Sequence, residues 1–391
     1  MSIVSELEKE ECCGCSACMS ICPVSAISMK TDEEGFLYPS ISQNKCINCG
    51  LCEINCAFRH RKHANLPIMP CTYLVKHNNI TTRMKSRSGG FFVAASDTFI
   101  KHGNYVCGCI LDNDLKAVHV LGNNTSIRDR MCGSKYVQSD IQLIYEKTAK
   151  ALSEGSRVLF SGTSCQIDAI TSYLKSKRIG MDNLYTLGIV CHGTPSPTIY
   201  KDFLKWCEQR YGGTVSSIDF RDKRRWGWES HKETVMIDNT AISGNIYTNI
   251  FHTDLCIRPC CYNCKYASLE RPEDITMADA WGVNKHNPEF HDNRGVSMII
   301  IHTEKGKELF EEAKPDFEYI PVDIKDYMQP NLSKPSRPKG DRETFWNIYH
   351  EGGFDAIVNI YGKTKKTKIV KDWIKRCVRK VIKGKNFYLP M

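Results

Sequence analysis

The sequence has no long apolar run and no basic stripe interleaved with aromatic residues. No stretch approaches the roughly 18 consecutive apolar residues that a membrane-spanning helix requires. The first residues, MSIVSELEKEE, are acidic and lack the apolar segment of a secretory signal. These absences predict a cytoplasmic protein. Disulfides are rare in that compartment, so cysteines there bind metals, act in catalysis or fill the core.

Positive charge is concentrated at the C-terminal end. The formal net charge is +9, and residues 363–385 alone carry eleven Lys or Arg against one Asp. The excess is largely local, so we expect no nucleic-acid partner. Apolar residues between 369 and 382 recur at helical spacing, which predicts an amphipathic helix. Packing of this helix on the body is favoured; the alternative is peripheral contact with an anionic membrane or docking on an acidic partner.

Cysteine, in contrast, is abundant and clustered. Of 21 cysteines, nine lie within the first 56 residues and four between 256 and 264. The spacing C-x2-C-x2-C-x3-C begins at Cys12 and recurs 34 residues later, beginning at Cys46. This internal repeat leaves Cys13 outside the spacing, as a spare thiol.

The repeated spacing predicts two iron-sulfur clusters. Such runs bind cubane clusters, and in two-cluster proteins the fourth cysteine of each run binds the other cluster. We therefore predict two crossed ligand sets, Cys12, Cys15, Cys18 and Cys56 for one 4Fe-4S cluster, and Cys46, Cys49, Cys52 and Cys22 for the other. Zinc is the alternative, but its sites typically show two C-x2-C pairs. The segment resembles a bacterial-type two-cluster ferredoxin, with Ala57 where a second proline is expected.

The rest of the chain has a different pattern. Residues 26–41 predict two short strands around a turn at Glu34-Gly35, and residues 57–70 predict a linker. From about residue 72, strand-like and helix-like segments alternate, which predicts an α/β domain with ligand-binding loops at strand ends. With 391 residues the chain is long enough for two or three domains. We expect boundaries at 1–65, 66–330 and 331–391, the last being a basic extension.

Seven segments of the larger part carry a family resemblance. In order they are SGG at 88–90, GSKYVQS at 133–139, VLFSGTSCQ at 158–166, CHG at 191–193, FRDK at 220–223, CYNCKYA at 261–267 and DITMADAWG at 274–282. Together they resemble the coenzyme F420 hydrogenase/dehydrogenase beta-subunit family, fused to an N-terminal ferredoxin domain. Ser164 and Ala278 depart from the family pattern, which has proline and glycine there.

The resemblance implies FAD and a third 4Fe-4S cluster. The ligands that it implies for this cluster are Cys165, Cys191, Cys261 and Cys264, with Cys256 and Cys260 as nearby competitors. Taken singly, Cys165 or Cys191 is more often a small buried hydrophobe. The implied fold is an α+β ferredoxin-like two-cluster module followed by an α/β flavin-binding body.

Flavin binding is expected at turns from strand to helix, where free N–H groups suit a pyrophosphate. The predicted flavin-binding residues are Ser88, Gly89, Gly90, Gly133, Ser134, Lys135, Tyr136, Gly162, Thr163, Gln166 and His192. Capping alone also explains serine and glycine at a helix start, and His192 is equally a satisfied loop residue. For Arg221, Asp222 and Lys223 the alternative is an exposed ion-pair cluster.

These observations predict an iron-sulfur flavoprotein oxidoreductase. FAD would exchange a hydride with a carrier, and single electrons would pass through the clusters. The expected carrier is a deazaflavin such as coenzyme F420, a nicotinamide or reduced ferredoxin. The alternative is a non-enzymatic electron-transfer subunit that feeds a partner redox protein, with surface-polysaccharide metabolism as an associated setting. No catalytic residue is assigned.

Overall fold

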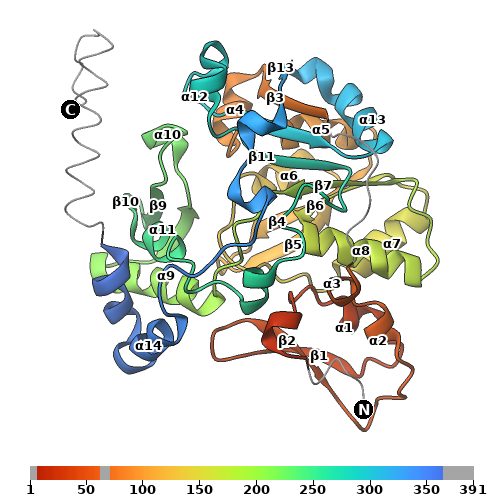
Figure 1. Ribbon diagram of the computed structural model, residues 1–391, viewed down its shortest axis with the longest axis vertical. Coiled ribbons are helices and arrows are strands. Elements are labelled where there is room, and N and C mark those ends of the chain that lie inside the picture. Colours follow the sequence, from red (N-terminus) through yellow and green to blue (C-terminus); the bar gives the residue numbers. More distant parts are fainter. Residues whose placement is uncertain (1–6, 62–70, 364–391) are drawn as a thin grey trace.

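The computed structural model describes residues 7–61 and 71–363. They form an N-terminal module packed against a larger body (Figure 1). The predicted amphipathic helix at 369–382 lies outside the described residues, as does most of the predicted linker. Among the residues described, no helix is both long and apolar enough to cross a membrane.

The N-terminal module repeats one backbone path. Its elements are α1 (Ala17–Ile21), β1 (Ile27–Thr31), β2 (Leu37–Ile41), α2 (Leu51–Ile54) and α3 (Ala57–His60). Gly14 and Asn48, which are 34 residues apart, have positive φ angles of 68° and 54°. Ser16 and Gly50 also have positive φ, 62° and 71°, and each directly precedes a short helix. The two copies of the cysteine spacing therefore fold alike, and the expected hairpin, β1 with β2, is confirmed.

The body is built on a mixed eight-stranded sheet with the order β13-β3-β12-β11-β7-β6-β4-β5. Strands β11, β7, β6 and β4 run parallel to one another, and the remaining pairings are antiparallel. The bounds of these strands are β3 (Cys71–His77), β4 (Tyr105–Leu111), β5 (Ala117–Gly122), β6 (Val158–Thr163), β7 (Leu184–Ile189), β11 (Ile275–Asp279), β12 (Ser297–Ile301) and β13 (Phe317–Pro321).

Helices cover both faces of this sheet because side chains alternate along each strand. Leu159 of β6 belongs to the core under α5 and α13, whereas its neighbours Val158 and Phe160 belong to the core under α7 and α8. The helices on the body near the sheet are α4 (Ile80–Lys85), α5 (Phe91–Ile100), α6 (Thr125–Met131), α7 (Ile144–Ser153), α8 (Ser164–Ser176), α12 (Val283–His286) and α13 (Glu304–Ala313).

A second lobe forms around a small antiparallel sheet with the order β10-β9-β8. Its elements are α9 (Pro197–Tyr211), β8 (Val215–Asp219), α10 (Lys223–Trp226), β9 (Glu233–Ile237), β10 (Thr240–Gly244), α11 (Ile246–Phe251), α14 (Arg342–Ile357) and the π-helical turn η8 (Val358–Gly362). The sequence defines the start of α9 locally, since the Ser196 hydroxyl accepts the N–H of Ile199 and a proline follows it.

The described part of the expected C-terminal extension belongs to this second lobe. Phe345 and Trp346 of α14 share one core with Ile199 and Phe203 of α9. α14 and η8 therefore pack with the second lobe, and the boundary at residue 330 stays a prediction.

The N-terminal module is fixed to the body at several points. α1 and α3 lie against α8, as Figure 1 shows. The hydroxyl of Tyr145 in α7 donates a hydrogen bond of 2.9 Å to the carbonyl of Cys15. At the hairpin turn, the Glu34 carboxylate forms an ion pair with Arg342 of α14. These contacts hold the cysteine loops of the module in a defined position on the body.

Candidate functional site

Three motifs meet at one edge of the sheet. β6, β7 and β11 are parallel, so their carboxyl ends lie at the same edge, where ligands bind in sheets of this kind. Cys165 comes two residues after the end of β6, and Cys191 two residues after the end of β7. Asp279 is the last residue of β11.

Six cysteines line a pocket at this edge, between the module and the body. They are Cys13, Cys165, Cys191, Cys260, Cys261 and Cys264. The pocket encloses about 560 Å³ of empty space, including space open to solvent. All four cysteines implied as ligands of a third cluster are present; their role as ligands stays a prediction. Of the two competitors, Cys260 lines the pocket, whereas Cys256 lies in the core of the second lobe.

Cys13 is the unexpected member of this pocket. The sequence spacing leaves it as a spare thiol, yet it packs beside Cys165, Cys261 and Cys264. Its direct neighbour Cys12 belongs to the first predicted ligand set. The cysteine loop of the module therefore contributes to two groups of thiols at once.

The thiols of the pocket are unfavourable places for an isolated negative charge. Burial raises the pKa of Cys264 to about 12 and raises that of Cys191 further. Cys261 is the exception, because a hydrogen bond from Cys260 lowers its pKa to about 7. Buried thiolates require a metal or another cation nearby, so this donor set fits a metal cluster.

A single metal ion does not match the arrangement. Among residues 7–61 and 71–363, no group of three or more His, Cys, Asp or Glu side chains is placed to hold one ion. A cubane cluster binds each thiolate at a different iron, so its ligands need not converge on one point. The cysteine pocket is therefore not packed around a single ion.

The structure also gathers the two crossed cysteine sets of the module. Burial raises the pKa of Cys18, and so do four neighbouring thiols, those of Cys15, Cys12 and Cys56 and that of Cys52 from the other set. The last cysteine of the second run thus lies beside the first run, as crossing requires.

The second crossed set lines a pocket of its own, with about 370 Å³ of empty space. Its cysteines are Cys22, Cys46, Cys49 and Cys52. The N–H of Ala26 donates to the sulfur of Cys22 at 3.2 Å, and Cys49 is exposed. The four cysteines of the first set are all half-buried, so Cys49 is the one fully exposed cysteine of the two sets.

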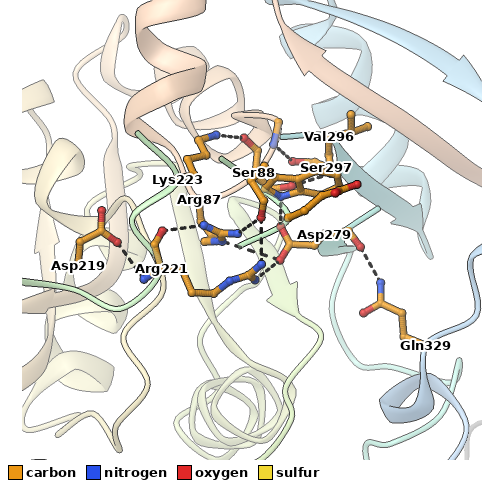
Figure 2. A network of polar contacts seen from close by, with 12 residues as sticks. Arg87, Ser88, Asp219, Arg221, Lys223, Asp279, Val296, Ser297 and Gln329 are labelled. Atoms are coloured by element: carbon orange, nitrogen blue, oxygen red, sulfur yellow. Dashed lines mark hydrogen bonds and ion pairs between the residues drawn. The ribbon is translucent and has the colours of Figure 1, made fainter. Parts of the chain in front are cut away.

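A network of charged side chains lies beyond the cysteine pocket, at the end of β11 (Figure 2). Arg221 donates to the Asp279 carboxylate at 2.7 Å, and Lys223 donates to the carbonyl of Ser88 at 2.7 Å. Arg87 donates to the carbonyl of Arg221 at 2.8 Å. Residues of the SGG, FRDK and DITMADAWG segments, which are far apart in the sequence, therefore meet here.

The alternative interpretation of Arg221, Asp222 and Lys223 as an exposed ion-pair cluster is wrong, because these residues are only 5%, 1% and 4% exposed. Burial opposes ionisation of Asp279, but Arg221 and Arg87 lower its pKa below the usual value. Two guanidinium groups thus share one carboxylate. The Nε atoms of Arg87 and Arg221 are buried and have no hydrogen-bond partner among the described residues, although Arg87 Nε lies 3.9 Å from the Asp279 carboxylate. Such buried, incompletely satisfied donors suit an anionic group.

The SGG turn is occupied by contacts within the protein. The N–H of Gly89 donates to the Ser297 hydroxyl, and its carbonyl accepts the N–H of His77. The Ser88 hydroxyl donates to the carbonyl of Val296. Gly90, with φ at 93°, is the residue that caps α5, not Ser88. These contacts account for the sequence of the turn without a ligand.

Several other predicted flavin-binding residues have structural roles. The Lys135 ammonium donates to three carbonyls at the end of α6, so it does not point at a ligand. Gln166 and Thr163 form a capping box at the start of α8, and Gly162 faces the Gln166 side chain. Tyr136 packs between Phe220 and Phe251.

The remaining predicted flavin-binding residues divide between the cysteine pocket and a loop. His192 lines the pocket, as does Thr163 of the capping box, and His192 lies 2.5 Å from the Asp254 carboxylate. Gly133 and Ser134 lie in the loop after α6. These placements leave His192 as the predicted residue that adjoins both thiols and a charged group.

A row of rings connects the cysteine pocket with the charged network, and sequence reasoning missed it. The ring centroids of His192 and His252 are 5.8 Å apart, and those of His252 and His231 are 5.5 Å apart. His231 stacks on Trp281 at 5.5 Å, and the Arg221 guanidinium lies 4.8 Å from the Trp281 ring centroid. Only the tertiary fold brings these residues together, although Trp281 lies within a quoted motif.

Two repeated cysteine loops, together with a pocket of six cysteines on a mixed α/β body, define an iron-sulfur protein. Residues 11–59 match the family described as 4Fe-4S dicluster domain. Residues 155–325 match the family described as the C terminus of the coenzyme F420 hydrogenase/dehydrogenase beta subunit. The chain thus joins a dicluster 4Fe-4S domain to a domain of the coenzyme F420 hydrogenase/dehydrogenase beta-subunit family, as its motifs predicted.

Solved structures include a similar chain in the F420-reducing NiFe hydrogenase complex from Methanosarcina barkeri, studied as a xenon derivative. The two chains are 17% identical, with a TM-score of 0.46, and the match covers 72% of this chain and 92% of that one. None of the curated proteins compared with this chain matches it.

Proposed function

We propose that this chain is an iron-sulfur flavoprotein oxidoreductase that couples a two-electron hydride carrier to one-electron clusters. The observation that carries the proposal is the pocket of six cysteines at the edge where β6, β7 and β11 end. It lies between the cysteine loops of the module and the charged network around Asp279. One row of rings joins the two sides.

The third cluster would be held by Cys165, Cys191, Cys261 and Cys264. Two of them follow the ends of buried strands, and two belong to the 3-10 turn Pro259–Asn263 and the residue after it. Rigid elements on both sides fix the separations of the thiols. Their burial keeps water away from the sulfur atoms, which is one of the factors that set a cluster's potential.

FAD would bind beside the charged network, and bound FAD can accept a hydride and release electrons singly. We assign its pyrophosphate, or another anionic group, to the Nε donors of Arg87 and Arg221, which form no hydrogen bond among the described residues. The rings of Trp281 and His231 offer apolar faces next to these donors. This placement replaces the SGG turn, whose groups already bind the protein.

The alternative function is a subunit that passes electrons to a partner redox protein without a small-molecule substrate of its own. The exposed Cys49 favours it, because the outer cluster site faces away from the body. The two functions share the same clusters and differ in what reaches the flavin. A deazaflavin and a nicotinamide are the hydride carriers to test first, with reduced ferredoxin as a one-electron donor.

The test is the cofactor content of anaerobically purified protein. We expect about twelve irons, three clusters of four, and about one FAD per chain. Cys191→Ala should lower the iron content by about four, since it removes a thiol of the six-cysteine pocket. Cys256→Ala is the matched control, because Cys256 is a buried cysteine that lies outside that pocket.

Two results would contradict the proposal. About eight irons in the wild-type protein would exclude the third cluster, and absence of flavin would exclude hydride coupling. Where flavin is present, bleaching by a deazaflavin or a nicotinamide supports the enzyme. A flavin that neither carrier bleaches supports the partner-dependent subunit.

A further inference from the structure

Arg258 connects the body to the first cysteine loop of the module. Its side chain is 1% exposed. The Nε atom donates to the carbonyl of Cys12 at 2.7 Å, and Nη2 donates to the carbonyl of Leu37 at 3.0 Å. Nη1 donates to the Gln138 side chain at 2.9 Å. One guanidinium group therefore binds three separate segments of the chain.

The positive charge of Arg258 has no carboxylate partner in the described part of the chain. The other buried arginines all have one, in the pairs Arg83 with Asp292, Arg128 with Asp97, Arg221 with Asp279 and Arg271 with Glu273. An unpaired buried charge is strongly unfavourable. The surroundings of Arg258 must therefore supply negative charge in another form.

The nearest group that can carry this charge is the sulfur of Cys12. Nη2 lies 3.5 Å from it, within hydrogen-bond range for sulfur. The rings of Tyr38 and Phe36 have their centroids 4.1 Å and 5.3 Å from Cζ, and Arg258 also lines the six-cysteine pocket, together with Cys13 and Cys260. A thiolate bound to a cluster remains negatively charged, unlike a free buried thiol.

The fold reserves space for this approach at Gly14. Its φ is +68°, and a Cβ atom there would lie 2.7 Å from Nη1 and 2.9 Å from Cζ of Arg258. The loop between Cys12 and Cys15 thus needs glycine both for its backbone conformation and for contact with the guanidinium.

We infer that Arg258 is the positive counter-charge of the cluster held by Cys12 and raises its reduction potential. The inference rests on the proposed function, because it requires that cluster to be present. Reduction adds one negative charge, which burial of the cluster disfavours. A nearby cation and a hydrogen bond to sulfur both favour it.

The position of this cluster explains why its potential matters. Cys13, the residue after Cys12, lines the six-cysteine pocket, and Cys52 of the outer set packs in the same core as Cys15. The Cys12 cluster therefore lies between the outer cluster and the third one. Each electron that it accepts from one neighbour leaves for the other, so a very low potential would block transfer in both directions.

The experiment is a redox titration of the full, anaerobically purified chain, followed by electron paramagnetic resonance. Arg258→Met keeps an unbranched side chain but removes the positive charge and the hydrogen-bond donors. We expect one cluster midpoint to fall by about 59 mV or more, which corresponds to a tenfold change in the one-electron equilibrium. Arg258→Lys, which keeps a charge without the planar fork, should give a smaller fall.

The control is Arg83→Met, which removes another buried arginine at a distance from the cysteine loops, where the chain pairs it with Asp292. It should leave every cluster midpoint unchanged. Unchanged midpoints in Arg258→Met with full iron content would overturn the inference. Should that variant lose iron, Arg258→Gln decides, because it also removes the charge but keeps a hydrogen-bond donor, and a wild-type midpoint there with full iron content also overturns the inference. Wild-type protein without cluster signals would instead contradict the proposed function.

Discussion

Lys223 illustrates how a side chain that looks like a surface charge acts inside the protein. Its Nζ donates to the carbonyls of Arg83, Ser88 and Arg294 at 2.6, 2.7 and 2.8 Å. Burial, followed by the neighbouring Arg87 and Arg83, lowers the pKa of Lys223 to about 7. The lysine thus joins the SGG turn to the FRDK segment, and burial makes it lose its proton at a lower pH than an exposed lysine.

The depressed pKa of Lys223 predicts a pH-dependent contribution to stability. Between its folded pKa of about 7 and an ordinary lysine value of about 10, the native state binds fewer protons than the unfolded state. Stability from this group therefore rises with pH in that window and is lowest below pH 7. We expect the loss of unfolding free energy in Lys223→Met to grow by about 1 kcal/mol per pH unit from pH 7 to 9.

Urea unfolding at pH 7, 8 and 9 measures this difference between the wild type and the variant. Cysteines also titrate in this range, but they do so in both proteins and cancel in the comparison. Lys307→Met is the control, since Lys307 is 65% exposed and should give the same small effect at each pH. A penalty for Lys223→Met that does not vary with pH would show that the lysine keeps its ordinary pKa.

At the residue scale, the sequence predicted groups whose spacing is local and missed those that meet only in the fold. The eight module cysteines follow a fixed spacing, and they gather as two crossed sets. Cys13 and Arg258 carry no such signal, because their neighbours Cys165 and Cys12 are 152 and 246 residues away in the sequence. Burial of Arg221 was missed for the same reason, since its carboxylate partner lies on another strand.

At the scale of elements, the start of α5 depends on close packing of the SGG turn. A Cβ atom at Gly89 would lie 2.1 Å from the carbonyl oxygen of Val75 and 2.5 Å from the backbone nitrogen of Ser297. Both contacts are with backbone atoms of neighbouring strands, which cannot move independently. The turn therefore joins α5 to β3 and β12.

We expect Gly89→Ala to lower the free energy of unfolding by about 2 kcal/mol or more, because it overpacks a buried backbone contact. Gly180→Ala is the matched control, since nothing lies within 4 Å of a Cβ there, and its effect should stay within about 0.5 kcal/mol. Urea unfolding measures both. If Gly89→Ala lowered the free energy of unfolding as little as the control but lost flavin, the result would instead support flavin binding by the SGG turn.

Elements with a complete local signal were predicted well. The hairpin of β1 and β2 around Glu34-Gly35, predicted from residues 26–41, is confirmed. Flavin binding by the SGG turn stays a prediction, because serine and glycine before a helix are also found where two backbones cross closely. The sequence alone does not distinguish a glycine that faces a ligand from one that faces another strand.

At the scale of the whole molecule, the outer end of the module differs from the rest of the surface. Four exposed apolar side chains surround or adjoin the second crossed cysteine set, and we name them the outer patch. They are Val24, Ile47, Leu51 and Ile54, exposed by 37%, 61%, 36% and 69%. Three of them line the same pocket as Cys22, Cys46, Cys49 and Cys52.

The outer patch fits a protein that exchanges single electrons. The chemistry predicted at this position is one-electron transfer, and a partner must bring its own cofactor close to the outer cluster. Contacts of this kind are small and transient, so a few apolar side chains suffice. We therefore predict that Ile47→Lys and Ile54→Lys each slow reduction of the clusters by reduced ferredoxin by about tenfold, equivalent to about 1.4 kcal/mol.

Stopped-flow absorbance with reduced ferredoxin, and with dithionite in parallel, separates docking from damage to the cluster. Dithionite is small and needs no docking surface, so its rate should not change in either variant. Ile360→Lys introduces the same charge at a side chain of η8, in the second lobe, that is 56% exposed, and it should leave both rates unchanged. If ferredoxin reduced the clusters of all variants at the wild-type rate, electrons would have to enter at another face. If dithionite reduced a variant more slowly than the wild type, the introduced lysine would perturb the cluster itself. The cluster predicted at Cys12, Cys15, Cys18 and Cys56 lies between the outer set and the six-cysteine pocket. Loss of ferredoxin reduction in the outer-patch variants alone would therefore establish the order in which electrons cross the molecule.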